Sequence, residues 1–165
     1  MNKRVAYIIF LVLLNIGLDQ YSKHIVRAEV LPGSRTEIVG KLLQLMNVEN
    51  TGAFLGIGSD SHPTIKLIFL LILPVIVLSV VLYYLLTNRS LDRLSVIGFS
   101  CVAGGGIANL YDRFVHGSVT DFLFMDFSFV QTGIFNVADL SVTSGMILLI
   151  IASYQQKRKS ENVIS

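Results

Sequence analysis

Residues 67–86 read LIFLLILPVIVLSVVLYYLL, an unbroken run without a charged side chain. A helix of about 20 apolar residues crosses a hydrocarbon core of roughly 30 Å, so this stretch predicts a transmembrane helix. Three further stretches are nearly as apolar and carry polar residues near one end, at about 5–24, 94–114 and 135–154. The sequence therefore predicts four membrane spans.

The overall composition is typical of a membrane protein. Of the 165 residues, 53% are hydrophobic and 15% are charged, against about 25% charged in soluble domains. The length allows one domain, residues 1–165. The net charge of +2 provides no basic field for nucleic acid, and a single cysteine, Cys101, permits neither an internal disulfide nor a cysteine zinc site.

Basic residues predict how the spans are oriented. If the chain crosses the membrane four times, seven basic residues flank the span ends on one side: Lys3, Arg4, Arg89, Arg93, Lys157, Arg158 and Lys159. The other side has two longer connections, 25–66 and 115–134, in which basic residues are mixed with carboxylates. Because lysine and arginine in short flanking segments favour the cytoplasm, we expect an inner-membrane protein with both termini cytoplasmic and both connections outside.

Polar residues in three of the expected spans lie at a similar depth. Counting a rise of about 1.5 Å per residue from the cytoplasmic ends, Asp19, Asn109 and Asp139 all fall in the outer leaflet, and Asn136 shares a helix face with Asp139. Ionisable groups in hydrocarbon cost roughly 3 kcal/mol on insertion scales and normally face a bundle interior or a cavity. The shared depth therefore predicts a shared cavity, although Asp19 and Lys23 could simply form an i, i+4 ion pair.

The connection between the third and fourth spans supplies a second carboxylate for this layer. A turn signal at 116–118 would allow Asp121 to fold back toward Asp139. Two other carboxylates compete for that role. Asp112 could instead pair with Arg113 or Lys66 at a helix end, and Asp126 could be a solvated loop residue.

A close pair of carboxylates can carry out hydrolysis. Two carboxyl groups within about 3 Å cannot both ionise cheaply, so one retains a proton. The ionised group can take a proton from an attacking water while the protonated group donates to an amide carbonyl. This predicts an aspartyl protease in the membrane. Four residues are candidates to hold the substrate backbone and to set the two pKa values: Asn50, Asn109, Arg113 and Asn136.

Other kinds of site fit the sequence less well. All three histidines lie at or outside the expected membrane edge, and there is no G-x-S-x-G, no H-E-x-x-H and no cysteine cluster. We therefore expect no metal ion and no other cofactor. A small transporter or proton-relay protein remains an alternative because intramembrane aspartates also relay protons, although polar groups in one leaflet provide no path to the cytoplasmic side.

Four strings closely resemble the motifs of bacterial lipoprotein signal peptidases, the type II signal peptidase family. They are LDQYSK (18–23), VENTGAFLG (48–56), GGGIANLYDRFVHGSVTDF (104–122) and FNVAD (135–139). NTGA or FNVAD alone is weak, but the ordered set is very specific and the match covers all four spans and both outer connections.

The resemblance implies an activity and a fold. The activity would be aspartyl endopeptidase cleavage of diacylglyceryl-modified prolipoproteins, just before the lipidated cysteine. The fold would be an all-α membrane protein of four transmembrane helices, with a small extracytoplasmic β-sheet and a short helix formed from about Thr36 to Phe54. The expected partners are the prolipoprotein, membrane lipid and inhibitors of the globomycin type, and we expect a monomer that binds no nucleic acid.

By motif position, Asp121 and Asp139 would form the catalytic pair, Gly105 would allow a close approach, and Asp112 would orient the loop. The complete set implied for substrate binding or support of the pair is Asp19, Lys23, Asn50, Gly105, Asn109, Asp112, Arg113 and Asn136. Two departures from the family pattern are Leu140, where serine is frequent, and the glycine triplet 104–106, where an alanine is common. Neither touches a carboxylate of the pair.

Overall fold

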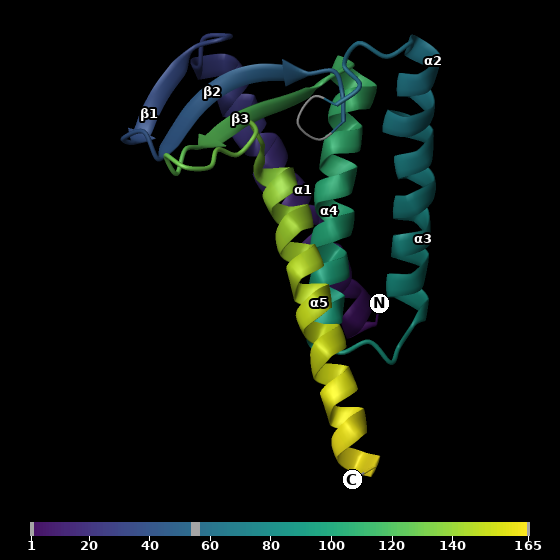
Figure 1. Cartoon of the computed structure of the whole chain (residues 1–165). Helices are drawn as coiled ribbons and strands as arrows, with labels where there is room; N and C mark the ends of the chain where they lie inside the picture. Colours follow the sequence, from purple (N-terminus) through teal and green to yellow (C-terminus); the bar gives the residue numbers. More distant parts are fainter. Residues whose placement is uncertain (1, 54–56, 165) are drawn as a thin grey trace.

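The computed structural model describes residues 2–53 and 57–164 and is drawn in Figure 1. Four helical rods run along one another, and a small sheet lies at one end of them. Both chain termini lie toward the opposite end. Each rod is long and apolar enough to cross a membrane. The rods are α1 (Lys3–Glu29), the continuous run of α2 (Pro63–Lys66), η2 (Leu67–Ile72) and α3 (Leu73–Thr87), then α4 (Arg93–His116) and α5 (Val137–Ile164).

The first two rods are longer at their sheet ends than the apolar runs that predict them. α1 continues past 24 to Glu29 and ends three residues before Pro32, which disfavours helical geometry in the residue ahead of it. The second rod begins at Pro63 rather than 67, because His62 caps it and proline is well tolerated at the first helical position. Hydropathy locates the membrane core, whereas caps and prolines decide where the helices end.

The second rod contains a π-helical segment, Leu67–Ile72, which ends two residues before Pro74. The Leu73 backbone N–H donates to the Ile68 carbonyl, five residues back, as in a π-helix. Pro74 has no N–H with which to continue an α-helical ladder, and its ring crowds the preceding turn. The wider turn is therefore a local response to Pro74, and the sequence pattern alone predicted an uninterrupted helix here.

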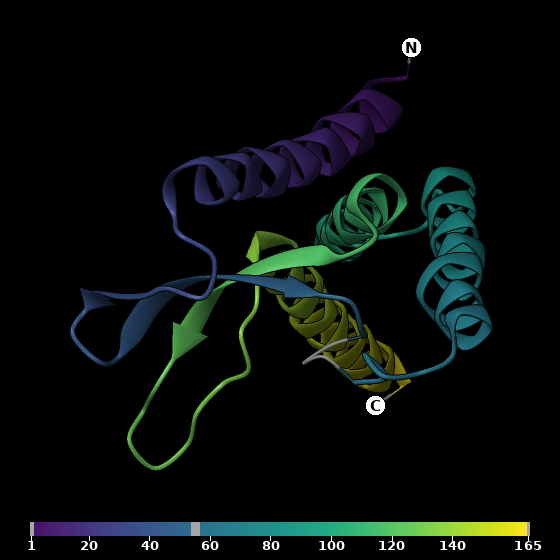
Figure 2. The same ribbon diagram turned by 90° about the horizontal axis from the view of Figure 1, so that it is seen from above.

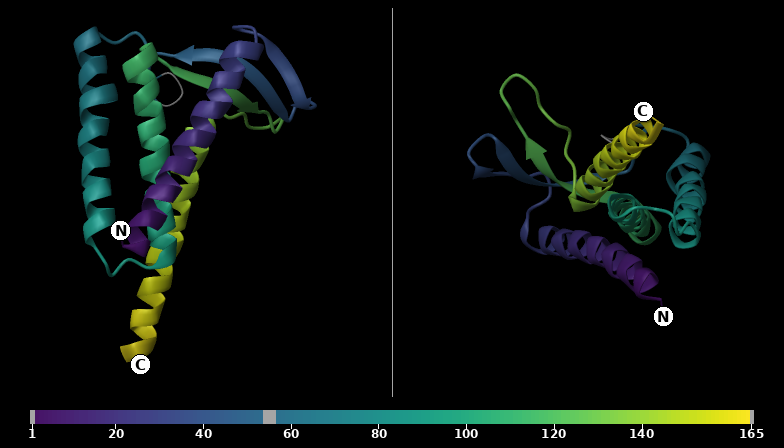
Figure 3. Two further views of the ribbon diagram at one scale, coloured as in Figure 1. Left: turned by 180° about the vertical axis from the view of Figure 1, so that it is seen from behind. Right: turned by 90° about the horizontal axis from the view of Figure 1, so that it is seen from below.

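α4 is the central rod, with α1 and α5 on one side of it and α3 on the other (Figures 2 and 3). The glycine triplet 104–106 faces all three neighbours. A Cβ on the first glycine would lie 2.6 Å from Cβ of Asn15, on the second 2.4 Å from the Ala138 carbonyl oxygen, and on the third 2.5 Å from a Leu78 methyl. Successive helix positions point about 100° apart. Three adjacent glycines therefore let α4 approach three helices at one level.

The sheet has three antiparallel strands in the order β1-β2-β3. They are β1 (Arg35–Val39), β2 (Leu43–Asn50) and β3 (Val119–Met125). β3 follows α4 after a turn at Gly117, whose φ of 74° is the left-handed cap at which a helix commonly ends. The sheet projects sideways from the bundle (Figure 2).

Two details of the implied extramembrane part differ from expectation. The sheet is not confined to 36–54, because its third strand comes from the connection 115–134. That strand forms by pairing with a segment about 70 positions earlier, as in the Val48–Asp121 and Asn50–Val119 pairs, and local sequence carries little signal for so distant a partner. No helix occurs in the described part of that stretch, residues 36–53, and Phe54 lies outside the described residues.

We predict that Gly105→Ala destabilises the protein whereas Gly17→Ala does not. The added methyl would lie 2.4 Å from a backbone oxygen of α5 at Gly105, but would meet nothing within 4 Å at Gly17. Overpacking of this kind costs about 1–3 kcal/mol. Thermal unfolding in detergent should show a lowered midpoint for Gly105→Ala alone. Equal midpoints for the two variants would contradict the close approach of α4 and α5.

Candidate active site

Asp139 is held at the start of α5 by a reciprocal hydrogen-bonded cap. The Asn136 side-chain oxygen accepts from the Asp139 backbone N–H at 2.9 Å, and the Asp139 carboxylate accepts from the Asn136 backbone N–H at 3.2 Å. This is the capping-box arrangement, with an aspartate as the third residue of the helix. The spacing N-x-x-D in FNVAD thus has a local structural cause as well as its place in a motif.

Asp121 comes from β3, on a different part of the chain. Its two carboxylate oxygens accept from the side-chain amides of Asn136, at 2.6 Å, and of Asn50, at 2.9 Å. Asn136 therefore bonds to both carboxyl groups, to Asp139 through its backbone and to Asp121 through its side chain. One asparagine fixes the two aspartates relative to each other.

Asn109 on α4 holds the second oxygen of Asp139. Its amide N–H₂ donates to Asp139 at 2.9 Å, and its oxygen accepts from the Lys23 ammonium at 2.8 Å and from Asn136 at 3.2 Å. An ammonium has donors only, so it requires the oxygen of Asn109 on its side. Lys23 thereby fixes which way the Asn109 amide points, and the N–H₂ is left facing the carboxylate.

A buried ion cluster lies behind Asn109. Lys23 is fully buried, and its ammonium lies 2.7 Å from Asp19 and 2.6 Å from Asp112, both also fully buried. Arg27 adds a second cation at 3.1 Å from Asp112. The expected i, i+4 pair of Asp19 and Lys23 is present, but it is one part of a larger cluster. Gln20 donates to Asp112 at 3.0 Å within it.

Asp19 has a second structural role. Its other carboxylate oxygen accepts from the backbone N–H of Ala138 at 2.8 Å. This N–H belongs to the first turn of α5, where backbone donors have no partner inside the helix. Asp19 on α1 therefore caps the same helix end that carries Asp139.

The pairing expected for Asp112 with Arg113 or Lys66 is wrong. Asp112 points toward α1 and is bound by Lys23 and Arg27. Arg113, one position along α4, instead donates to the Gly52 carbonyl at 3.1 Å. Neighbouring helix positions face about 100° apart, so two consecutive charged residues serve different sides of the helix.

The segment after β2 is fastened to this region by two side chains. Asn50 accepts from the Gly52 N–H at 2.9 Å and donates to the Ala53 carbonyl at 3.1 Å, which is the local turn that asparagine favours. Arg113 holds the Gly52 carbonyl from α4. The start of this loop is thus tied to Asp121 through Asn50.

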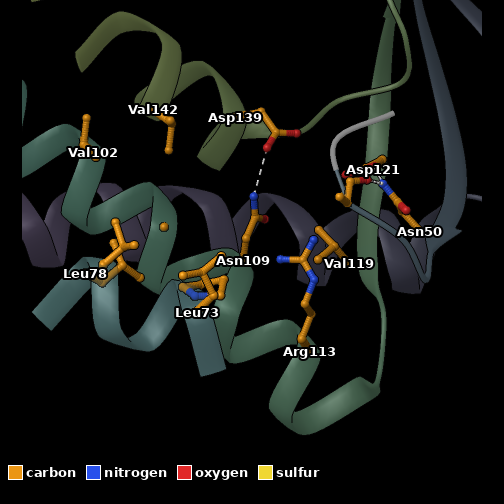
Figure 4. A pocket seen from close by; sticks show the side chains of 14 residues that line it. Asn50, Leu73, Leu78, Val102, Asn109, Arg113, Val119, Asp121, Asp139 and Val142 are labelled. Carbon is orange, nitrogen blue, oxygen red and sulfur yellow. Dashed lines mark hydrogen bonds between the residues drawn. The ribbon is translucent and has the colours of Figure 1, made fainter. Parts of the chain in front are cut away.

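Both aspartates line a cavity of about 400 Å³ among α3, α4, α5 and the sheet. Figure 4 shows Asp121, Asp139, Asn109 and Arg113 gathered in one half of it and apolar side chains in the other. The apolar half includes Leu73, Pro74, Val77, Leu78, Val102 and Val142, whereas Val119 lies beside Arg113 and Asp121. The cavity can therefore hold a ligand with one polar and one aliphatic part.

Burial raises the pKa of Asp121 to about 6, with a smaller contribution from the negative charge of Asp139. The hydrogen bonds from Asn50 and Asn136 oppose this rise because they favour the ionised form. A carboxyl group with this pKa can carry or release a proton near neutral pH.

Every residue that the sequence assigns to the site lies in this region. Some line the cavity: Asn50, Asn109, Arg113, Asp121 and Asp139. Others support those residues from behind or from the side: Asp19, Lys23, Gly105, Asp112 and Asn136. Asp126 does not line the cavity, and its carboxylate closes a turn with the Ser128 N–H and the Gln131 amide.

Sequence reasoning missed Gln20, Arg27 and Thr120. Arg27 donates to the Thr120 hydroxyl at 2.7 Å and so joins α1 to β3. Arg27 extends the i, i+4 series of Asn15, Asp19 and Lys23 by one more turn. Following that series beyond the expected end of the first span would have found it.

Comparisons with known proteins agree on one family. The sequence model of the family described as signal peptidase (SPase) II matches residues 11–155. A lipoprotein signal peptidase of Borrelia duttonii is 34% identical over 98% of this chain and 97% of its own length. One from Sulfurihydrogenibium is 32% identical over 98% of this chain and 100% of its own length.

The fold has a solved counterpart. A bacterial membrane enzyme structure, obtained by the in meso method at 2.3 Å resolution, superimposes with a TM-score of 0.82. The sequence identity is 27%, and the alignment covers 93% of this chain and 90% of that one. The four helical rods and the small sheet thus belong to one shared architecture.

We predict that Lys23→Met lowers stability strongly whereas Lys41→Met does not. The first change leaves Asp19 without its cation in a buried site, and such a loss costs about 3–5 kcal/mol. Lys41 is exposed between β1 and β2, where substitutions change stability by about 0.5 kcal/mol or less. Denaturation in detergent should separate the two variants, and similar midpoints would contradict a structural role for the cluster.

The raised pKa of Asp121 predicts a pH dependence of stability. A folded-state pKa of about 6, above the ordinary 3.8, means that the folded protein binds this proton more tightly than the unfolded chain. Ionisation of Asp121 therefore opposes folding, and its stabilising contribution is lost as pH rises from about 4 to about 6. Asp121→Asn cannot ionise, so its thermal midpoint should fall less than that of the unmodified protein between pH 4.5 and pH 7.5. An identical fall in both proteins would contradict the assignment.

Proposed function

The chain belongs to the signal peptidase II family, and from that premise we propose that it is an intramembrane aspartyl endopeptidase acting on diacylglyceryl-modified prolipoproteins. Cleavage falls just before the lipidated cysteine. Asp121 and Asp139 form the catalytic pair. The observation that carries this proposal is the bridge made by Asn136, which hydrogen-bonds both carboxyl groups at the rim of one cavity.

Charge balance supports a shared proton in the pair. In the buried cluster, Lys23 and Arg27 offset Asp19 and Asp112. Among the residues lining the cavity, Arg113 is then the single cation for two carboxyl groups. One retained proton makes this remainder neutral, as burial in a poorly solvated site favours.

The chemistry needs both protonation states at once. The ionised aspartate takes a proton from water as its oxygen attacks the amide carbonyl carbon, and the protonated aspartate donates to the carbonyl oxygen. In the tetrahedral intermediate that results, the C–N bond then breaks as the first aspartate returns its proton to the leaving nitrogen. The second aspartate takes its proton back from the hydroxyl group that becomes the carbonyl of the new carboxyl group. The second amide N–H of Asn109 and the guanidinium of Arg113 lie beside the reacting groups and hold the substrate backbone.

The two halves of the cavity suit a lipidated peptide. The polar half faces the scissile bond, and the aliphatic half receives apolar parts of the substrate that remain in the membrane. The chain acts as a monomer, as a single integral domain over residues 1–165, and globomycin-type cyclic peptides occupy the same cavity.

The active site faces the outer side of the inner membrane. Lysine and arginine flank the rod ends on the side of both termini, and this supports a cytoplasmic location for that side. The sheet and the cavity residues Asp121 and Asp139 then lie toward the outer surface, where the lipidated cysteine of a prolipoprotein is anchored. Connections 25–66 and 115–134 are extracytoplasmic.

We predict that Asp121→Asn and Asp139→Asn each abolish cleavage of a diacylated peptide carrying the signal-peptide junction. Each change removes one half of the proton-sharing pair while nearly preserving side-chain shape. The assay follows release of the lipidated fragment by chromatography, with and without globomycin. Retained processing by either variant would refute the catalytic assignment.

Asp126→Asn is the matched control, because it makes the same chemical change in the loop that follows β3, outside the cavity. It should cleave at nearly the unmodified rate. The transporter alternative makes a different prediction: reconstituted protein would move protons or solute across liposomes and release no peptide.

A further inference from the structure

A second cavity, of about 280 Å³, lies between the outer end of the second rod and the end of α4. Its lining is Thr51, Pro63, Lys66, Leu67, Leu70, Leu71, Arg113 and Gly117. Two of these residues are cations and none is acidic. The leucines make the rest of the lining aliphatic. The cavity thus combines positive charge at the membrane edge with an apolar wall below it.

Lys66 is the unexplained residue of this cavity. It is half-buried and lines the cavity, and along the rod it lies one turn from Leu70, two from Pro74 and three from the buried Leu78. Across the described residues, its ammonium makes no hydrogen bond and no ion pair. A lysine at the end of a membrane helix normally extends to water or head groups. Here it lies beside a cavity without a carboxylate to pair with.

Arg113 connects this cavity to the proposed active site. It lines both cavities, and its terminal nitrogen donates to the Gly52 carbonyl. Its Nε–H is buried and has no acceptor within the part of the chain that the structure describes. A buried donor without an acceptor is costly, so Arg113 is incompletely satisfied by the residues that the structure describes.

The π-helical segment shapes the apolar wall. Leu67, Leu70 and Leu71 belong to this wider turn ahead of Pro74 and line the cavity together. π-Helical turns frequently occur at functional sites. A helix irregularity, a lysine without a partner among the described residues and an incompletely satisfied arginine therefore meet at one place. The proposed peptidase reaction uses Arg113 from the other cavity and makes no use of Lys66.

We propose that this cavity binds one anionic phospholipid, with its phosphate between Lys66 and Arg113 and an acyl chain along the leucines. Phosphate oxygens accept from both cations, and phospholipid phosphates lie at the depth where a membrane helix ends. Basic pockets between transmembrane helices bind anionic head groups in this way. The diacylglyceryl group of a prolipoprotein has no phosphate, so it does not provide the charge that the site matches.

The test measures lipid binding by delipidated protein in neutral detergent, without substrate, and so does not depend on peptidase activity. Short-chain phosphatidylglycerol should bind more tightly than phosphatidylcholine of equal chain length. Lys66→Gln should weaken the phosphatidylglycerol affinity by about tenfold, the loss of one charge-assisted contact, and leave the phosphatidylcholine affinity unchanged. Lys41→Gln, which removes an exposed lysine of the sheet, is the matched control and should change neither affinity.

Two further arms separate the possible sources of the anion. Glycerol 3-phosphate and inorganic phosphate should compete at least a hundredfold less well than the lipid, because they lack the acyl chain. Equal competition would overturn the proposal in favour of a free-anion site. Equal binding of the two lipids, or a Lys66→Gln variant with unchanged affinity, would also overturn it.

Cleavage kinetics in phosphatidylcholine alone provide the last arm. Lys66→Gln should retain the KM of the unmodified protein for the diacylated peptide, within about twofold. A large rise in KM without anionic lipid would mean that the cavity holds substrate instead, and would overturn the proposal. Absence of cleavage in the unmodified protein, with lipid binding intact, would contradict the proposed peptidase and leave this site standing.

Discussion

The pairing of buried charges around Lys23 is the constraint on which the site depends. A charge in the membrane interior is costly unless opposite charges and hydrogen bonds surround it. Lys23 meets this requirement by contacting Asp19 and Asp112 and by donating to Asn109. Each of these three partners performs a second task. Asp19 caps α5, Asp112 binds Arg27 on α1, and Asn109 holds Asp139.

The same cluster links three helices at a single depth. α1 contributes Asp19 and Lys23, α4 contributes Asn109 and Asp112, and the first turn of α5 is held by Asp19. The glycine triplet 104–106 allows the backbones to approach closely enough for these contacts. In a membrane, where apolar surface gives little drive for helices to associate, close backbone packing and polar contacts specify the arrangement.

The sheet completes the pair by delivering Asp121 from outside the bundle. β3 begins just after the left-handed turn at Gly117, and Arg27 secures it through Thr120. Asn136 then joins this strand to the cap of α5. One carboxyl group thus stands on a helix and the other on a strand, and both are held by asparagine side chains with few remaining degrees of freedom. The proposed proton sharing between the two acids requires rigid support of this kind.

Sequence alone determined the four spans, because a long run of apolar side chains is favourable only in the hydrocarbon core of a membrane. It also placed Asp19, Asn109 and Asp139 at one depth, because the rise per residue of an α-helix is fixed. The resemblance of the ordered motifs supplied the remaining residues of the candidate site. Local sequence did not predict β3, since its partner strand is distant along the chain, nor the pairing of Asp112, since the direction of a helix face is set by neighbouring helices. Three further features follow only from the tertiary structure, because each depends on which groups meet across different helices. They are the orientation of the Asn109 amide, the contacts of Arg27 and the lack of a partner for Lys66 among the described residues.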